Sequence, residues 1–139
     1  MAREATLILV KPDAMQRGLA GEILRRFEAR GLELRAARLV RVDRDLAENH
    51  YDVHREKPFF PELVEFITSG TTLAMVLEGE GAIATCRKTI GATNPADAEA
   101  GSIRGDLATS MPNNLVHGSD SPESAEREIA LWFSDDELV

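Results

Sequence analysis

The chain has 139 residues, a length that one domain with a single hydrophobic core accommodates. Its hydrophobic content of 43% and charged content of 29% are typical of a folded globular protein and exclude a disordered or fibrous chain. A formal charge of −8 argues against binding to nucleic acid or anionic membranes, because both depend on a net basic surface. We therefore expect a single domain over residues 1–139, with neither nucleic acid nor membrane among its partners.

The apolar runs and the cysteine content of the sequence bear on its location and its covalent cross-links. The first apolar run, Thr6 to Val10, is too short for the core of a signal peptide, and no apolar stretch approaches the ~20 residues of a membrane span. A cytoplasmic location is therefore expected. Cys86 is the only cysteine, which excludes an intrachain disulfide and a cysteine-based metal cluster.

Strand and helix patterns alternate along the chain, and no linker, low-complexity tract or internal repeat divides it. The expected elements are a strand at 5–11, a helix at 21–30, a strand at 32–42 with a break or bulge near two alanines, helices at 43–54 and 61–69, a strand at 71–77, a helix at 82–90, a short strand at 115–117 and a helix at 122–133. Residues 91–112 are expected to be irregular, and a loop this long is usually functional. The order βαββαβ with additions predicts an α/β (α+β) chain with the ferredoxin-like arrangement, a four-stranded antiparallel sheet with helices packed on one face.

Two common phosphate-binding loops can be tested against the sequence. Residues 78–84 follow a strand and open a helix, as a dinucleotide-binding fingerprint does. Glu78 and Glu80 would repel a pyrophosphate, however, and the chain beyond lacks the alternating elements of a doubly wound sheet. We interpret this segment as a tight strand-to-helix turn. The Gly-x-x-x-x-Gly-Lys-[Ser/Thr] loop is absent from the sequence.

His117 is the most informative candidate for chemistry. It stands at the expected end of a strand, just before a helix whose start is marked by Ser121 and Pro122. Unpaired N–H groups at such a start favour an anion, and a neutral imidazole is a good nucleophile if another group holds its second nitrogen. Glu128, beside the apolar stripe of that helix, is a candidate for this group. On local chemistry alone, a capping or merely exposed histidine is the alternative.

The other two histidines, His50 and His54, lie four residues apart on an expected helix, a spacing that permits a shared metal ion. No third ligand follows at a recognisable interval, so a zinc site is not expected. We interpret His50 as a structural residue.

Several motifs together resemble the nucleoside diphosphate kinase family. The segment Asn114-x-x-His117-Gly118-Ser119-Asp120-Ser121 is similar to the active-site signature of these enzymes. The similarity extends over essentially the whole chain, through Lys11-Pro12-Asp13, the loop segment 91–98, Ile103-Arg104-Gly105-Asp106 and the segments 124–126 and 132–133. Several independent motifs in the family's order make a chance match a poor explanation.

The resemblance implies a reversible ping-pong phosphotransferase. A nucleoside triphosphate, typically ATP, would give its γ-phosphate to His117, and a nucleoside diphosphate would then take it from the phosphohistidine, maintaining NTP and dNTP pools. Phosphoryl transfer needs cations and hydroxyls placed around the phosphate oxygens. The residues that the resemblance assigns to phosphate contact are Lys11, Tyr51, His54, Arg87, Thr93 and Arg104. Ser119 and Glu128 are expected to orient His117.

The resemblance also assigns residues to the sugar and the base of the nucleotide. Lys11 and Asn114 would reach the sugar hydroxyls, and Phe59, rather than Phe60, would stack on the base. Met111 stands where the family commonly has a valine over the base, and its apolar, adaptable side chain should keep this clamp. Stacking with little hydrogen bonding to the base edge predicts that purine and pyrimidine nucleotides both serve.

Magnesium and assembly are implied by the family as well. Mg²⁺ is expected to be held mainly by nucleotide phosphates and water, near Asp120, with no direct protein ligand. We expect a homo-oligomer built from dimers, a hexamer rather than a tetramer.

Two rival functions belong to other classes. A single-stranded RNA-binding module would need an aromatic platform on the sheet, whereas aromatics make up only 5% of the chain and its charge is acidic. A phosphohistidine enzyme with another substrate, such as a mutase, is the second rival. The Lys-Pro-Asp motif and the long loop favour nucleotides over it.

Overall fold

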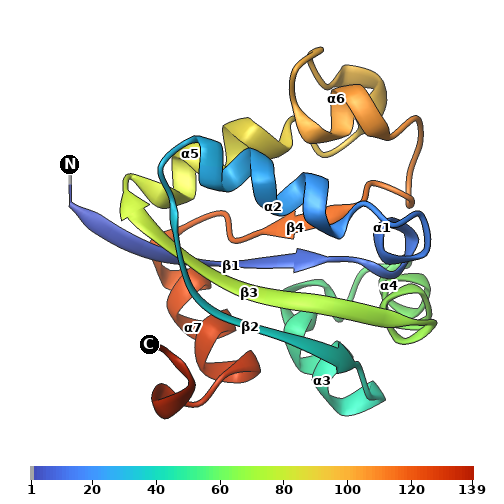
Figure 1. Ribbon diagram of the computed structural model, residues 1–139. Coiled ribbons are helices and arrows are strands. Elements are labelled where there is room, and N and C mark those ends of the chain that lie inside the picture. The colour runs from blue at the N-terminus through green and yellow to red at the C-terminus, as the bar shows by residue number, and fades with distance from the viewer. Residues whose placement is uncertain (1) are drawn as a thin grey trace.

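The computed structural model describes residues 2–139 and has a four-stranded antiparallel sheet at its centre (Figure 1). The strand order is β2-β3-β1-β4, with β1 (Arg3–Val10) and β3 (Thr71–Glu80) inside and β2 (Glu33–Arg41) and β4 (Val116–Gly118) at the edges. Each neighbouring pair is antiparallel. With helices between β1 and β2 and between β3 and β4, this order is the ferredoxin-like arrangement, so the expected fold class is confirmed.

Helices cover both faces of the sheet. In chain order they are α1 (Pro12–Gln16), α2 (Ala20–Ala29), α3 (Arg44–His50), α4 (Phe60–Thr68), α5 (Ala82–Ile90), α6 (Ile103–Leu107) and α7 (Pro122–Trp132), with the 3-10 turns η1 (Asp52–His54), η2 (Pro95–Asp97) and η3 (Asp135–Glu137). Figure 1 shows α2, α5 and α6 on one side of the sheet and α3, α4 and α7 on the other. None of the helices described between residues 2 and 139 has the length and apolar character that crossing a bilayer requires.

The expectation that helices pack on one face only is therefore wrong. In β1, Ile8 and Val10 belong to the core shared with α2 and α5, whereas Leu7 and Leu9 belong to the core shared with α3, α4 and α7. Side chains alternate across a strand, so an unbroken apolar run needs cover on both faces. The run itself was the signal for two cores.

Most elements lie where the sequence predicts them, with four differences. The helix expected at 43–54 ends at His50, and Asp52–His54 form a separate 3-10 turn. β3 runs on to Glu80, so residues 78–80 are strand, and only Gly81, with φ of +56°, turns the chain into α5. The stretch 91–112 is not irregular throughout, since it holds η2 and α6. α1 is too short, at five residues, to show a periodicity, and it is not among the expected helices. The predicted bulge is confirmed between Leu34 and Ala36.

The long connection between α5 and β4 is packed rather than open. Ser102 caps α6 by accepting a hydrogen bond from the Gly105 N–H over 3.0 Å. A Cβ at Gly105 would lie 1.8 Å from the Glu99 carbonyl oxygen, so only glycine fits there. Arg26 of α2 binds Asp106 over 2.8 Å, which fixes α6 against the body of the domain.

β4 is the element that positions the site. It pairs with β1 so that His117 lies opposite Leu9, and the Lys11 N–H donates to the Leu115 carbonyl oxygen over 2.9 Å. Leu115 is fully buried with φ of +72°, a left-handed conformation that costs a residue with a side chain roughly 1–3 kcal/mol. The Asp13 carboxylate accepts from the Leu115 N–H over 3.1 Å and helps to hold this conformation.

Candidate active site

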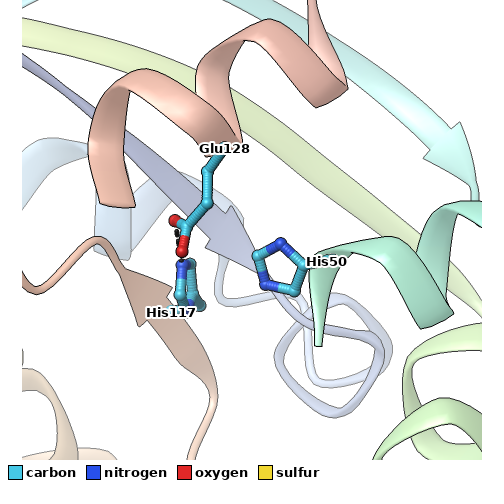
Figure 2. A group of neighbouring side chains, drawn as sticks. All are labelled: His50, His117 and Glu128. Carbon is cyan, nitrogen blue, oxygen red and sulfur yellow. Dashed lines mark hydrogen bonds and ion pairs between the residues drawn. The ribbon is translucent and has the colours of Figure 1, made fainter. Parts of the chain in front are cut away.

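His117 and Glu128 form the centre of the candidate site. Figure 2 shows the two side chains facing each other, with His117 Nε2 2.8 Å from Glu128 Oε1. β4 supplies His117, whose side chain is 20% exposed, and α7 supplies Glu128, whose side chain is 9% exposed. An ionised carboxylate only accepts hydrogen bonds, so Nε2 carries the proton and donates it. The other ring nitrogen, Nδ1, keeps its lone pair, which is the form that a nucleophile needs.

Ser119 supports Glu128 rather than His117 directly. Its hydroxyl donates to the same Oε1 over 2.8 Å and accepts from the Leu7 N–H over 3.3 Å. Burial acts to raise the pKa of Glu128, but the hydrogen bond and charge of His117, with smaller effects from Ser119 and Arg127, bring the net pKa below its ordinary value. Glu128 is therefore an anion at neutral pH.

The first turn of α7 makes no contact with the His117 ring that would hold it, and Glu128 holds the ring as the sequence predicts. Ser121 caps the helix by accepting from the Ser124 N–H over 3.1 Å. The hydrogen-bonded edge of His117 instead faces Glu128, which lies in the second half of the helix. A carboxylate on α7, and not its first turn, fixes the histidine.

Lys11 and Asn114 form a second buried pair. Lys11 Nζ donates to Asn114 Oδ1 over 2.8 Å, and the Asn114 Nδ2 donates to the Thr93 carbonyl oxygen over 3.1 Å and to Met111 Sδ over 3.3 Å. Burial and then the charge of Arg104 lower the pKa of Lys11 to about 8. Lys11 is thus a cation at neutral pH that has lost most of its hydration, and an anionic ligand would restore its interactions.

Two arginines complete the positive side of the site. The buried Arg104 guanidinium donates to three carbonyl oxygens, at 3.3, 3.0 and 2.6 Å, those of Gly91, Asn114 and Val116. Arg87 of α5 donates to the Gly118 carbonyl oxygen over 3.1 Å. Burial and then the charge of Arg87 lower the pKa of Arg104 to about 10, so Arg104 remains charged at neutral pH. Both arginines therefore brace β4 and place positive charge beside it.

The predicted base clamp consists of exposed apolar side chains. Phe59 is 44% exposed at the start of α4, and Met111 is 49% exposed. The Phe59 ring lies 5.5 Å from the His54 ring, centre to centre. Large apolar side chains exposed next to cations offer a surface that a nucleotide base could cover.

Comparison with known proteins shows which family has this arrangement. The family model for nucleoside diphosphate kinase matches residues 4–138. The chain belongs to the nucleoside diphosphate kinase family. A nucleoside diphosphate kinase of Trichormus variabilis is 59% identical over 136 residues, covering 98% of this chain and 91% of the relative. One of Symbiobacterium thermophilum is 61% identical over 132 residues, covering 95% of this chain and 88% of the relative.

Solved structures of nucleoside diphosphate kinases share the fold. The halophilic enzyme of Halobacterium salinarum, in complex with CDP, has a TM-score of 0.96 at 49% identity, covering 99% of this chain and 92% of that chain. The enzyme of Aquifex aeolicus has a TM-score of 0.96 at 48% identity, covering 99% of this chain and 100% of that chain. As a nucleoside diphosphate kinase, this chain transfers terminal phosphate between nucleoside tri- and diphosphates.

The residues expected at the site of this nucleoside diphosphate kinase are joined by direct contacts into three groups. These are His117 with Glu128 and Ser119; Lys11 and Arg104 with Asn114, Thr93 and Met111; and His54 with Phe59. Tyr51 is buried against His50, its ring centre 4.8 Å away, and so approaches His117 through that residue. Asp120 is exposed and lines a separate hollow with Glu4 and Pro122.

Three residues that contact the candidate site were not assigned to it from the sequence. His50, interpreted as structural, places its ring 4.7 Å from that of His117, and Arg127 holds the end of α3 on which His50 stands. His50 reaches His117, and Arg127 reaches α3, only because α3 packs against α7. No spacing in the sequence reveals this packing. The sequence does point to Asp13, because it belongs to the Lys-Pro-Asp motif. Its hydrogen bond with the Leu115 N–H, however, could be seen only in the folded structure.

Proposed function

We propose that Nδ1 of His117 carries the phosphate in a ping-pong reaction. The Nδ1 lone pair attacks the γ-phosphorus of a nucleoside triphosphate, in line with the bond to the oxygen that bridges to the β-phosphate. The N–P bond forms as the P–O bond breaks, the electron pair of the broken bond leaves with the diphosphate, and a second diphosphate reverses the step. The observation that carries the proposal is the 2.8 Å bond between Nε2 and Glu128, which leaves Nδ1 as the reactive nitrogen.

Glu128 is assigned an electrostatic role. The His117 ring becomes cationic as Nδ1 bonds to phosphorus, because Nε2 keeps its proton. A carboxylate 2.8 Å away stabilises that cation, and the bond from Ser119 to the same oxygen keeps the carboxylate in place. No proton needs to leave the Nε2–Glu128 bond during the reaction.

The phosphate oxygens are assigned to the cations Lys11, Arg87 and Arg104, with further contacts from Tyr51, His54 and Thr93. Lys11 and Asn114 are also assigned to the sugar hydroxyls. Support comes from the way these groups are held: Lys11 by Asn114, Arg104 by three carbonyl oxygens and Arg87 by one. Charges fixed in advance stabilise a transition state without the cost of reorganising at the moment of reaction.

Phe59 and Met111 are assigned to the base, and the site is proposed to accept purines and pyrimidines alike. Both side chains are apolar and exposed, and stacking does not distinguish base edges. The Halobacterium salinarum relative was solved with CDP, a pyrimidine nucleotide, which supports this tolerance within the family.

Mg²⁺ is part of the same proposal. This ion prefers oxygen ligands and keeps several waters, so nucleotide phosphates suit it. In the described chain, Glu128 already accepts two hydrogen bonds, and Lys11 and Arg104 are cations. The donor set fits an ion that arrives on the phosphates, with Asp120 assigned to its water shell. When bound, the ion would neutralise charge on the phosphate oxygens.

A hexamer built from dimers and a cytoplasmic location complete the proposal. The assembly is supported by β2, an edge strand that carries the exposed Leu39. Sedimentation velocity measures the assembly, and fractionation of the source cells measures the location.

Incubation with ATP labelled at the γ-phosphate tests the central step. The wild type should retain an acid-labile label, and phosphorus and nitrogen NMR should place it on Nδ1. His117→Ala should retain no label while its circular dichroism stays native, and the control Lys88→Ala, at an exposed position on α5 outside the assigned site, should be labelled like the wild type. A folded wild type that takes up no label, or takes it up on Nε2, contradicts the proposal.

A further inference from the structure

We propose that His50 is a positioning residue, whose neutral imidazole fixes the ring plane of His117 so that Nδ1 faces the nucleotide. This role rests on the proposed function of His117 as the phosphate carrier. It differs from the role of Glu128, which holds one ring nitrogen, because a single hydrogen bond leaves the ring free to rotate about that bond.

The contact between the two rings is direct. His50 is the last residue of α3, is 3% exposed, and places its ring centre 4.7 Å from that of His117, with the ring planes at 78° (Figure 2). This edge-to-face geometry is the preferred arrangement for aromatic pairs. Glu128 fixes the Nε2 edge and His50 limits the tilt, so the two contacts together define the direction of Nδ1.

α7 holds His50 by two further contacts. Trp132 Nε1 donates to His50 Nδ1 over 3.1 Å, and the Trp132 ring stands at 86° to the His50 ring, 5.5 Å away. Arg127 donates to the carbonyl oxygens of Asn49 and His50 over 3.0 and 3.1 Å. Because α7 also carries Glu128, one helix sets both contacts of the His117 ring.

The bond from Trp132 determines the protonation of His50. The indole N–H only donates, so His50 Nδ1 accepts and the ring proton is on Nε2. Burial, followed by the charges of His117, Lys11, Arg127 and His54, lowers the pKa of His50 well below its ordinary value, and Glu128 is the anion nearby. His50 thus stays neutral, which avoids a second positive charge beside His117 when that ring becomes cationic.

A metal site is the alternative use of this cluster. Ligand atoms of His50, His117 and Glu128 lie within 4.8 Å of one another. Nδ1 of His50 already accepts from Trp132, however, and Glu128 Oε1 already accepts from both His117 and Ser119. Coordination would break contacts that hold the nucleophile, so the geometry favours positioning.

Substitutions separate the ring of His50 from its hydrogen bond. His50→Asn keeps an acceptor near the place of Nδ1 but removes the ring, and Trp132→Phe keeps the His50 ring but removes its donor. Val64→Ala is the matched control, since Val64 is buried in the same core and has no role in the site. His50→Phe is the conservative variant, because it restores a ring against His117 while remaining neutral.

The rate constant for phosphorylation of His117 at saturating ATP is the main readout. We expect His50→Asn to lower it roughly 10- to 100-fold, as a small misplacement of a reacting group does, with the nucleotide KM changed less than about threefold. His50→Phe should recover part of this loss, and Trp132→Phe should lose less than His50→Asn. Val64→Ala should lower Tm without lowering the rate constant.

Nitrogen NMR of the wild type supplies a test that needs no variant. His50 should be neutral with its proton on Nε2 at pH 7 and still neutral at pH 6. A His50 protonated at pH 6, or protonated on Nδ1, overturns the proposal, as does a folded His50→Asn with a wild-type rate constant. An unlabelled wild type would instead overturn the role of His117, so the two failures are distinguishable.

Discussion

One oxygen atom, Glu128 Oε1, determines the chemistry available to His117. It accepts from Nε2 of the histidine and from the Ser119 hydroxyl, each over 2.8 Å. Two donors on one buried oxygen keep the carboxylate ionised, and the ionised carboxylate keeps the proton on Nε2. In the proposed reaction, these bonds leave Nδ1 as the reactive nitrogen before any nucleotide binds.

Removing the charge of Glu128 tests its assigned influence on His117. Glu128→Gln keeps an amide of similar shape but cannot stabilise the cationic ring, so we expect kcat to fall on the order of 10²-fold with little change in KM. Steady-state kinetics with ATP and a diphosphate acceptor measure both constants. Glu126→Gln, an exposed position on the same helix, is the control and should retain wild-type kcat. Equal effects of the two substitutions would rule out the assigned role.

Lys11 predicts a pH dependence of nucleotide affinity. Burial lowers its pKa to about 8, and a lysine is a cation below its pKa, so the free protein loses this charge as the pH rises through 8. ADP affinity should therefore be constant between pH 6.5 and 7.5 and weaken above pH 8. Calorimetric titration measures it. In Lys11→Arg the charge persists and the decline should flatten, whereas Lys88→Arg, at an exposed site on α5, should leave it unchanged. A decline that is identical in all three proteins would assign it to another group.

At the residue level, the sequence could supply identities but not distances. The signature around His117 names the histidine, and the apolar stripe of the last helix brings Glu128 to its edge, so this pair was predictable. The contact of His50 was not, because its spacing to His117 in the chain says nothing about how α3 packs on α7.

β4 is the element whose stability depends most on charged side chains. It has three residues, and a strand this short has few backbone hydrogen bonds of its own. Arg104 compensates by donating to the carbonyl oxygens of Asn114 and Val116, on either side of the left-handed Leu115. A residue assigned to phosphate contact is therefore also a structural support of the strand that carries His117.

Removing Arg104 should therefore cost stability as well as affinity. Arg104→Leu leaves three carbonyl oxygens without their donor, and we expect the free energy of unfolding to fall on the order of 3 kcal/mol. Urea denaturation measures the loss. Arg17→Leu, which removes one exposed bond to the Leu107 carbonyl oxygen, should cost less than about 1 kcal/mol. Similar costs for the two substitutions would mean that Arg104 does not support β4.

Periodicity predicted the regular elements of this fold because their apolar spacing is long enough to repeat. It placed α5 and the bulge of β2 correctly. It failed where local chemistry competes with spacing, since α6 depends on the Ser102 cap and on a glycine at 105 that no other residue could replace. The second helical layer was missed although the sequence indicated it, because the apolar run in β1 requires cover on both faces.

On the scale of the whole molecule, the sheet has one edge that its own chain covers only in part. The C-terminal residue donates its N–H to the Arg35 carbonyl oxygen over 2.9 Å, so the last segment lies along one part of β2. Farther along the same strand, Leu39 is 65% exposed. Edge strands with exposed apolar side chains invite pairing with another chain, which is the basis for the proposed assembly.

A charge at Leu39 should break that assembly. Leu39→Asp removes the gain of burying a leucine, about 1.5–3 kcal/mol for each copy, and adds the cost of desolvating a carboxylate. We expect the sedimentation coefficient to fall to that of a smaller species at micromolar protein, while the circular dichroism stays native because Leu39 packs little within one chain. Val53→Asp is the matched control, since Val53 is 71% exposed on the turn η1 rather than on a strand of the sheet, and should leave the assembly intact. A wild type that sediments as a monomer, or a Leu39→Asp variant that sediments like the wild type, would show that β2 is not the contact between copies.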